Sequence, residues 1–342
     1  MPQNSPLPNP TAIMQLGMGF WGSKTLLTAI SLGLFTRLAE RPMKARELKN
    51  AFGFQCADRH VFDFLDSLVS FGFLLREGIL DKAVYSNNKD ADFFLDRNKP
   101  SYLGGILEMA DHRLYELWGG LEDSLRTGRS QNKSNLFEKL CESPEQLREF
   151  LNAMRGIQMG NFMALAHKFD FSRYQTLCDA GGASADLCIQ VARQHEHIRC
   201  ISYDLPPVEP IALENIRRFG LENRIYTRSG DFFKAPLPAA DVVVMANVLH
   251  DWSEERKRAL IRAAYDALPA GGAYIVVENV IDDERSHNTF GLLMSLNMLI
   301  EVGNEGFDYT FSDFGGWAKE AGFSRMETIP LTGPASAIVS YK

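Results

Sequence analysis

Four short segments in the second half of the chain carry residue types that could bind a nucleoside and move a proton. The first, residues 176–186, begins with an apolar run that ends at Asp179 and continues as a turn of small residues with Gly181 and Gly182. Small residues let a ligand approach the backbone closely, and the N–H groups at the start of a helix favour polar ligand groups. Alone, such a turn is also typical of an ordinary strand-to-helix connection.

Two further acidic positions strengthen the nucleoside interpretation. Asp204 ends the next apolar run, 23 residues after Gly181, where a carboxylate can accept hydrogen bonds from both ribose hydroxyls. Asp231 ends another apolar run and could accept from the amine of adenine while Phe232 covers the ring. The structural alternatives are that Asp204 caps a helix and that both phenylalanines belong to the core, as we expect for Phe233.

The fourth segment, Met245–Trp252, places His250 directly after an apolar run. A neutral histidine can take up a proton near physiological pH because its ordinary pKa is about 6.5, and neighbouring acids could orient it. A lone histidine is more often structural. Its position at the edge that carries the three nucleoside-type signals favours a general base instead.

The elements that must position these residues follow from the apolar pattern. After Ser172, short apolar runs alternate with amphipathic segments, which predicts a mostly parallel sheet with helices on both faces, an α/β fold. Ligands of such sheets bind beyond the carboxyl ends of the strands. The expected strands are Thr176–Asp179, Cys200–Asp204, Ile225–Ser229, Asp241–Met245, Ala273–Glu278 and Ala337–Ser340.

The first half of the chain has a different pattern. Helical spacing of apolar residues predicts helices over Ile13–Leu38, Met43–Ala51 and Ala57–Phe71, followed by a small hairpin around Gly78, which is a winged-helix outline. Residues 100–170 look wholly helical, with a helix start at Ser143-Pro144. We therefore expect a winged-helix-like domain over 1–100, a helical region lining a pocket over 101–170 and the sheet domain over 171–342.

Composition excludes several classes of protein. The chain has 342 residues, 45% of them hydrophobic, and a net charge of −7, which gives no electrostatic footprint for nucleic acid or an anionic membrane. Five cysteines without a Cys-x-x-Cys pair argue against a disulfide framework or a zinc site and favour a reducing cytoplasm. The first residues lack the pattern of a signal peptide, and no apolar run is long enough to cross a membrane.

The order of these motifs resembles a known family. Asp-Ala-Gly-Gly, Tyr-Asp-Leu-Pro, Gly-Asp-Phe-Phe and Leu-His-Asp-Trp, followed by Leu-Pro-x-Gly-Gly-x-x-x-Val-x-Glu, resemble the dimerising small-molecule O-methyltransferases, which include plant caffeate and flavonoid enzymes and acetylserotonin methyltransferase. The resemblance covers nearly the whole chain. It implies a Rossmann-like domain behind an N-terminal dimerisation domain, a homodimer, S-adenosyl-L-methionine as cofactor, S-adenosyl-L-homocysteine as product, and no metal.

Matched residue by residue, the resemblance implies individual roles. His250 would be the general base, flanked by Glu278 and by Asp308, which is one methylene shorter than the family's glutamate. A second departure is the glycine loop, usually Gly-Gly-Gly-x-Gly, where this chain has Ala183 and Ala185. The methionine part of the cofactor would lie on Gly181 and Gly182, the ribose on Asp204 and the adenine on Asp231 and Phe232. The expected cofactor site also includes Asp179, Leu205 and Asn247.

The acceptor is less well defined. The expected substrate-binding residues are Phe20, Trp21, Met109, His112, Arg113, Tyr115, Met159, Phe162, Met294 and Met298, although spacing alone would place most of them in the core. A Met-rich apolar pocket suits an aromatic hydroxyl, whereas His112, Arg113 and Arg155 could anchor a carboxylate. The alternative is S-methylation of a small thioether acid such as 4-methylthio-2-hydroxybutyrate, toward dimethylsulfoniopropionate.

The outline of the first half also allows a different class of function. A winged helix could make the chain a DNA-binding regulator with a degenerate cofactor domain. The segment Ala57–Phe71, where a recognition helix would lie, carries Asp58, Asp63 and Asp66 and would repel phosphate. Dimerisation or substrate lining is therefore favoured. The altered glycine loop also leaves open a cofactor-binding fold that has lost catalysis.

Overall fold

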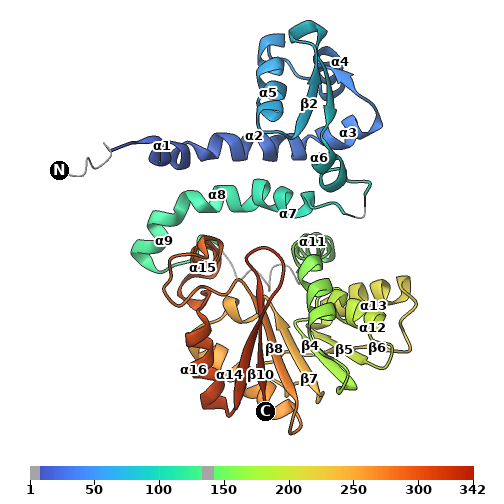
Figure 1. Cartoon of the computed structure of the whole chain (residues 1–342), viewed down its shortest axis with the longest axis vertical. Helices are drawn as coiled ribbons and strands as arrows, with labels where there is room; N and C mark the ends of the chain where they lie inside the picture. Colours follow the sequence, from blue (N-terminus) through green and yellow to red (C-terminus); the bar gives the residue numbers. More distant parts are fainter. Residues whose placement is uncertain (1–7, 100, 133–141) are drawn as a thin grey trace, which may run out of the picture. The chain divides into compact units, whose positions relative to one another are not determined.

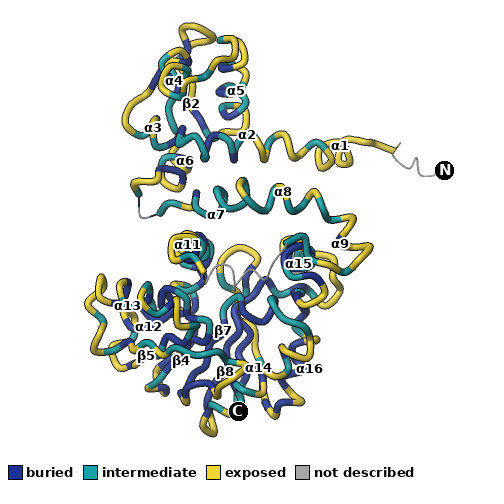
Figure 2. Tube along the Cα trace, turned by 180° about the vertical axis from the view of Figure 1, so that it is seen from behind, coloured by how far each residue is buried: buried dark blue, intermediate teal, exposed yellow. Residues whose placement is uncertain are grey.

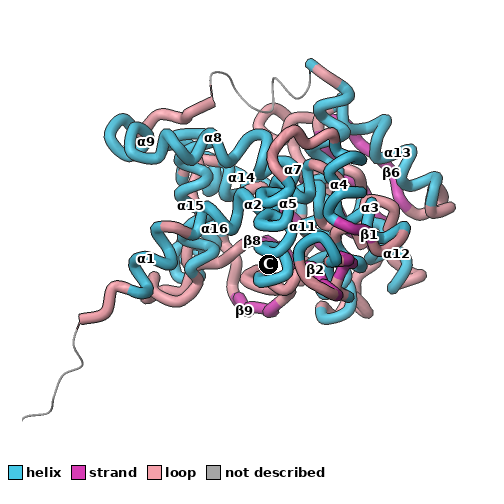
Figure 3. The backbone as a smooth tube through the Cα atoms, turned by 90° about the horizontal axis from the view of Figure 1, so that it is seen from above, coloured by secondary structure: helices cyan, strands magenta, loops and turns pink. Residues whose placement is uncertain are grey.

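The computed structural model describes residues 8–99, 101–132 and 142–342, and the chain divides into two compact units between Tyr115 and Glu116 (Figure 1). In the N-terminal unit three helices precede a pair of helices and a hairpin. In Figure 3 its strands are short beside the helices. The helices are α1 (Thr11–Gly17), α2 (Gly19–Ser31), α3 (Leu34–Glu40), α4 (Ala45–Phe52), α5 (Asp58–Ser70), α6 (Lys89–Phe94) and α7 (Gly104–Met109).

A three-stranded antiparallel sheet completes this unit, in the order β1 (Met43–Lys44), β3 (Val84–Asn87), β2 (Leu74–Glu77). The expected hairpin is confirmed, with Leu75 paired to Ser86. The predicted helix start at Met43 is wrong: Met43 and Lys44 are extended and pair with β3, and α4 begins at Ala45. Side chains of α3, α4, α5 and the sheet share one core, which contains Leu48, Leu65 and Tyr85.

The prediction that residues 100–170 are wholly helical is wrong at residues 101–103, 128–132 and 169–170. A π-helical turn (Ala110–Leu114), α8 (Tyr115–Leu117), a 3₁₀ turn (Trp118–Gly120) and α9 (Leu121–Thr127) follow one another, but residues 128–132 are not helical. Gly128 ends α9 with φ +67°, a conformation that glycine adopts without strain. Residues 133–141 lie outside the described part. The predicted start at Ser143-Pro144 is confirmed, because α11 (Pro144–Lys168) is capped by the Ser143 hydroxyl.

The C-terminal unit contains a seven-stranded sheet in the order β6-β5-β4-β7-β8-β10-β9. All six predicted strands are present, and β4 to β8 run parallel. Sequence analysis missed β9, an edge strand whose alternating side chains are mostly exposed. The strands are β4 (Thr176–Ala180), β5 (Arg199–Asp204), β6 (Ile225–Ser229), β7 (Val242–Ala246), β8 (Ala273–Glu278), β9 (Arg325–Pro330) and β10 (Ser336–Tyr341).

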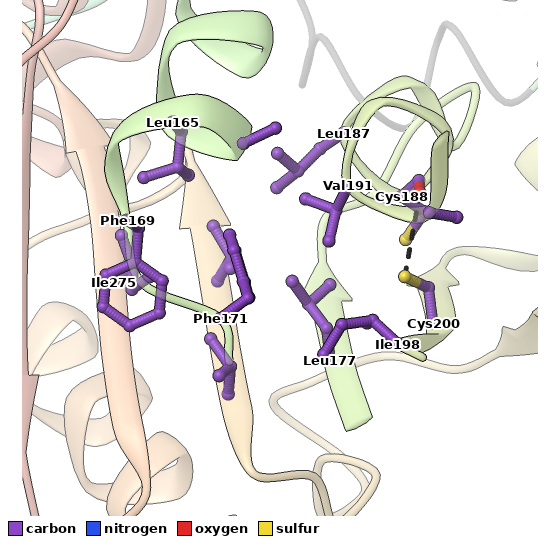
Figure 4. Close-up of a cluster of buried hydrophobic side chains, with 14 of the residues drawn as sticks. Leu165, Phe169, Phe171, Leu177, Leu187, Cys188, Val191, Ile198, Cys200 and Ile275 are labelled. Atoms are coloured by element: carbon purple, nitrogen blue, oxygen red, sulfur yellow. Dashed lines mark hydrogen bonds between the residues drawn. The ribbon is translucent and has the colours of Figure 1, made fainter. Parts of the chain in front are cut away.

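Helices cover both faces of this sheet. On one face, side chains such as Leu177 and Ile275 pack against the end of α11, α12 (Asp186–Gln194) and α13 (Glu209–Arg218), as Figure 4 shows for part of the cluster. On the other face, alternate residues such as Cys178 and Val276 pack against α14 (Glu254–Ala267) and α16 (Phe311–Ala321). The strands β4, β7 and β8 are accordingly buried in Figure 2. Helix α15 (Thr289–Val302) lies between β8 and α16 in the chain.

The topology fixes where a ligand would bind. From β4 the chain adds β5 and β6 on one side and then returns to place β7 on the other side of β4. The carboxyl ends of β4 and β7 therefore flank the switch point where such sheets bind their ligands. No helix within the described residues is long and apolar enough to span a membrane.

Candidate active site

At the first two positions of the turn after β4, only glycine fits without a steric clash. Gly181 has φ +84°, and a Cβ atom there would lie 2.6 Å from Cγ2 of Val248. A Cβ atom on Gly182 would clash with the hydroxyl of Ser202 and lie 3.0 Å from the carbonyl oxygen of Asp179. The expected glycine turn is therefore present and closely packed, and the N–H groups of Gly181 and Gly182 both donate to the Tyr203 carbonyl, at 2.8 and 3.2 Å.

Asp204 connects this turn to the end of β5. Its Oδ2 accepts a hydrogen bond from the Ala183 N–H at 2.8 Å, and its Oδ1 accepts from the Leu205 N–H at 2.7 Å. The alternative that Asp204 caps the following helix does not hold, because α13 begins at Glu209 and Asp204 bonds none of its N–H groups. Burial raises the pKa of Asp204, although both backbone N–H groups act to lower it.

Asp179 lies beneath the same turn and is 3% exposed. Burial, with the neighbouring charges of Asp204 and Asp186, raises its pKa to about 8. A carboxyl group in such a site gains from a cation nearby, because the cation compensates the lost hydration. The turn therefore lies directly above a buried acid.

The adenine candidates lie after β6. Asp231 accepts a hydrogen bond from the Phe233 N–H at 2.9 Å and pairs with Lys234 at 3.0 Å. Phe232 is partly buried and packs edge-on against Trp252, with ring centroids 6.1 Å apart. The expectation that Phe233 belongs to the core is wrong: it is 38% exposed and stacks below Arg256.

Asn247 occupies a strained position directly after β7. Its φ is +52°, which is uncommon for a residue other than glycine, and its N–H donates to the Val277 carbonyl at 3.0 Å. The turn it forms carries Val248 against Gly181 and leads into the short helical segment Leu249–Asp251. Backbone strain of this kind is concentrated at functional sites.

His250 lies among three carboxylates. Its Nδ1 is 3.4 Å from Oε2 of Glu278 and 3.5 Å from Oδ1 of Asp308, and its Nε2 is 3.7 Å from Oδ1 of Asp251. The Glu278 carboxylate is held by the Leu249 N–H at 3.1 Å. The structure therefore brings together the predicted base and both predicted flanking acids, from three separate segments of the chain.

These groups shift one another's proton affinity. Burial alone lowers the pKa of His250, but the carboxylates, Glu278 foremost, outweigh it and hold that pKa well above 6.5. Burial raises the pKa of Glu278 to about 7 and that of Asp251 to about 6. The cluster therefore holds protons that it can exchange near neutral pH.

Sequence analysis missed a buried lysine beside this cluster. Lys257 is 0% exposed; its ammonium donates to the Trp252 carbonyl and lies 3.4 Å from the ring centroid of Phe307. Burial lowers its pKa to about 8, against the attraction of Glu278 and the other acids. Its spacing with the buried residues Leu260, Ile261 and Ala264 puts it on the apolar face of α14. This spacing is the feature of the sequence from which a buried lysine could have been predicted.

One further property of the cluster concerns cations. His250, Glu278 and Asp308 each offer one ligand atom, and these atoms lie within 4.8 Å of one another. One imidazole nitrogen and two carboxylate oxygens at this spacing are also a possible ligand set for a metal ion. The expected absence of a metal therefore needs an experimental test.

The expected acceptor residues divide between the two units. In the N-terminal unit, Phe20, Trp21 and Tyr115 border a recess of about 460 Å³, while Met109, His112 and Arg113 lie at the end of α7 and in the π-helical turn. In the C-terminal unit, Met159 and Phe162 are partly buried on α11, Met294 is partly buried on α15 and Met298 is buried there. Phe162 packs against the core.

The chain matches known proteins over most of its length. Residues 118–324 match the family model of the O-methyltransferase domain, and residues 14–97 match that of the O-methyltransferase dimerisation domain. A tetracenomycin polyketide synthesis 8-O-methyl transferase of Streptomyces glaucescens is 38% identical over 335 residues, 97% of each chain. An N,N-dimethyltransferase of Streptomyces rimosus is 33% identical, covering 86% of this chain and 85% of its own.

A solved structure resembles the whole chain. The crystal structure of human N-acetylserotonin methyltransferase in complex with SAM matches with a TM-score of 0.89 and 27% identity, covering 100% of this chain and 99% of the other. None of these three relatives is described as an S-methyltransferase or a DNA-binding protein.

Proposed function

The chain belongs to the family of S-adenosylmethionine-dependent small-molecule O-methyltransferases, and from that premise we propose that it methylates a phenolic hydroxyl with His250 as general base. The observation that supports this role is the placement of Nδ1 of His250 at 3.4 and 3.5 Å from two buried carboxylates. A proton on Nδ1 would face these acids, so Nε2 is the nitrogen that takes the proton of the acceptor.

The residues of the C-terminal unit fit the proposed cofactor. In this proposal Asp204 accepts hydrogen bonds from the ribose hydroxyls, Asp231 and Phe232 hold the adenine, and the backbone of Gly181 and Gly182 lines the methionine part. The buried carboxyl of Asp179 suits the cationic end of that part. Leu205 and Asn247 complete the proposed contacts. The cofactor, when bound, supplies an electrophilic methyl group on a sulfonium.

The surroundings of His250 suit a phenol as acceptor. Methyl transfer forms an oxygen–carbon bond and breaks a carbon–sulfur bond, and the acceptor proton passes to the imidazole. Glu278, Asp308 and Asp251 stabilise the resulting imidazolium and raise the proton affinity of His250, which brings it closer to that of a phenolate. Positioning of the three reacting atoms supplies much of the remaining rate.

The relatives suggest which phenols to test. The S. glaucescens relative is described as acting in tetracenomycin polyketide synthesis, and we propose that this chain also takes a fused-ring aromatic polyketide. Flat fused rings suit Met- and aromatic-rich surroundings such as those of Met159 and Phe162. We further propose a cytoplasmic homodimer joined through the N-terminal unit, where Ile13, Leu16 and Trp21 expose apolar side chains, and a reaction that needs no metal.

A screen of acceptors with isotopically labelled S-adenosylmethionine tests the proposal. Hydroxylated naphthoates and anthraquinones, their amino analogues and a thioether acid are offered separately, and the methylated atom is located by mass spectrometry and NMR. We expect O-methylation of the hydroxylated fused-ring compounds and a loss of most of this activity with His250→Ala. Transfer only to the amines or only to the thioether would contradict the proposed acceptor, and no binding of S-adenosylhomocysteine would contradict the proposed cofactor.

A further inference from the structure

Two alanines in the turn after β4 adopt left-handed backbone conformations. Ala183 has φ +48° and Ala185 has φ +61°. An L-residue with a Cβ atom is strained in this region, and glycine is the residue that adopts it freely. The family that this chain resembles usually has glycine at both positions. Other contacts must therefore hold the turn in a conformation that its own residues disfavour.

The contacts that hold the turn come from two neighbouring helices. Asp186, directly after the turn, is 4% exposed, and its Oδ1 accepts from Nε and Nη2 of Arg155 on α11 at 2.8 and 2.7 Å. The side-chain amide of Asn215 on α13 donates to the same carboxylate at 3.1 Å and to the carbonyl of Ser184 at 2.7 Å. One buried acid thus fixes the end of the turn to α11 and α13.

The ion pair has the features of a strong interaction. The side chain of Arg155 is 26% exposed and that of Asp186 is 6% exposed, so water screens the pair little. Hydrogen bonds between two charged partners are stronger than neutral ones, and a buried carboxylate that loses its cation is destabilised. Arg155 is therefore engaged with Asp186, and the earlier expectation that it could anchor an acceptor carboxylate has no support here.

The other end of the turn is held as well. The Ala183 side chain packs against a small cluster that contains Leu147 and Leu151 of α11 and Val208. Its N–H donates to Oδ2 of Asp204 at 2.8 Å. The turn is thus fastened to α11 by an apolar contact at Ala183 and by the ion pair at Asp186, and it contacts the Asp204 carboxylate through the Ala183 N–H.

We propose that Arg155 and Asp186 are positioning residues that hold the turn 181–185 in its left-handed form and thereby set the affinity for the cofactor. This inference rests on the proposed function, because it assumes that the turn and Asp204 bind S-adenosylmethionine. Glycines would adopt the left-handed conformation without strain; here, in their place, the ion pair to α11 holds the alanines in it. Neither residue touches the reacting atoms in this role.

Calorimetric titration of the full-length protein with S-adenosylhomocysteine tests this role of the Arg155–Asp186 ion pair, which we call the clamp. Arg155→Met is expected to weaken binding about tenfold, as expected when a buried charged hydrogen bond is lost. The matched control is Arg148→Met, which removes an exposed ion pair of 2.8 Å between α11 and Glu214 of α13 and should change binding by less than about twofold.

A glycine rescue separates this role from a general structural one. Adding Ala183→Gly and Ala185→Gly to Arg155→Met should recover most of the lost affinity, because glycines hold the left-handed turn without a clamp. With an identified acceptor, Arg155→Met should raise the KM for the cofactor and leave kcat at saturating cofactor within about twofold. If Arg155→Met does not fold, Asp186→Asn, which keeps the shape and an acceptor oxygen, replaces it in the same measurements.

The outcomes distinguish failure of the clamp from failure of the proposed function. Unchanged affinity in Arg155→Met, or a loss that the glycines do not recover, overturns the clamp while the proposed function stands. A fall in kcat with no change in the KM for the cofactor overturns it too. Failure of the wild-type protein to bind S-adenosylhomocysteine, by contrast, overturns the proposed function itself.

Discussion

Nδ1 of His250 lies 3.4 Å from Oε2 of Glu278, a residue 28 positions further along the chain and on the neighbouring strand-end. Both side chains are almost fully buried, with 7% and 1% of the side chain exposed. A carboxylate in that position fixes the imidazole and stabilises its protonated form. Consequences for catalysis, binding, stability and metal dependence follow from this arrangement and from the turn beside it.

Replacement of the base should abolish most of the activity. His250→Ala and His250→Gln are both expected to reduce turnover by roughly 10²–10⁴-fold, because glutamine hydrogen-bonds but takes up no proton near neutral pH. S-adenosylhomocysteine affinity, measured by calorimetry, should change little. A glutamine variant that keeps most of the activity, with a flat pH profile from about 6 to 9, would contradict general-base catalysis by His250 and favour an acceptor that has no proton to lose.

Asp204→Ala should weaken cofactor binding for two reasons. It removes the proposed acceptor of the ribose hydroxyls, and it leaves the Ala183 N–H without its partner at 2.8 Å. We expect a loss of about 1–3 kcal/mol in S-adenosylhomocysteine binding, measured by calorimetry. Glu209→Gln on α13 is a nearby acidic control, because Glu209 binds Thr227 and Ser229. Equal effects of the two variants would show that general disturbance of this edge, and not ribose recognition, is being measured.

The stability of the ligand-free protein should fall as the pH rises from about 6 to 8. The pKa values of Asp179 (about 8), Glu278 (about 7) and His250 are higher in the folded chain than their ordinary values. The folded state therefore binds more protons than the unfolded state in this window, and the free energy of unfolding decreases with pH, by about 1–3 kcal/mol. Lys257, whose pKa is lowered to about 8, acts in the opposite direction above pH 8.

Urea unfolding at several pH values measures this slope, with Asp179→Asn as comparison. The amide is neutral in both states, so the variant should lose part of the pH dependence. A free energy of unfolding that stays constant or increases between pH 6 and 8 in the wild-type protein would show that these carboxyl groups ionise in the folded protein as they do in water.

Much of the fold followed from local patterns. The six predicted strands and the helix start at Ser143 depend on apolar runs and capping residues that lie next to one another in the sequence. The same holds for the positions of Asp204, the last residue of β5, and His250, four residues after the end of β7. The edge strand β9 escaped prediction because its side chains are mostly exposed and form no apolar run.

The parts that could not be predicted depend on contacts between distant segments. The ion pair of Arg155 and Asp186 joins residues 31 positions apart, and nothing local distinguishes Arg155 from a solvent-exposed arginine. Lys257 becomes part of the active-site electrostatics only once α14 packs beside Asp251 and Glu278. The sequence resemblance supplied Glu278 and Asp308, but the convergence of both acids on the same nitrogen of His250 required coordinates.

Metal removal should leave the reaction unchanged. The three ligand atoms of His250, Glu278 and Asp308 lie close enough to surround a cation, but a general base needs its imidazole for the acceptor proton. Dialysis against a chelator should therefore change turnover by less than about twofold, and added Zn²⁺ should inhibit if it binds there. Loss of activity that a divalent cation restores would overturn the metal-free mechanism.

Lys257→Met should shift the pH dependence of catalysis upward. The Lys257 ammonium is buried beside Glu278, Asp308 and Asp251, and its positive charge opposes proton uptake by this cluster. Without it the three acids act on His250 unopposed, so the pKa of His250 rises and the imidazole stays protonated to higher pH. The rise of kcat/KM with pH should move up by roughly one unit, while the rate at high pH changes little.

Arg262→Met provides the matched control for this variant. Arg262 lies on the same helix and pairs with Asp266 at 3.0 Å on the exposed side, so its loss should leave the profile in place. A thermal melt checks that Lys257→Met is folded, since methionine keeps the length and apolar contacts of the stem. A profile that does not move in the folded variant, or one that moves to lower pH, would show that Lys257 only fills space beneath the Phe307 ring.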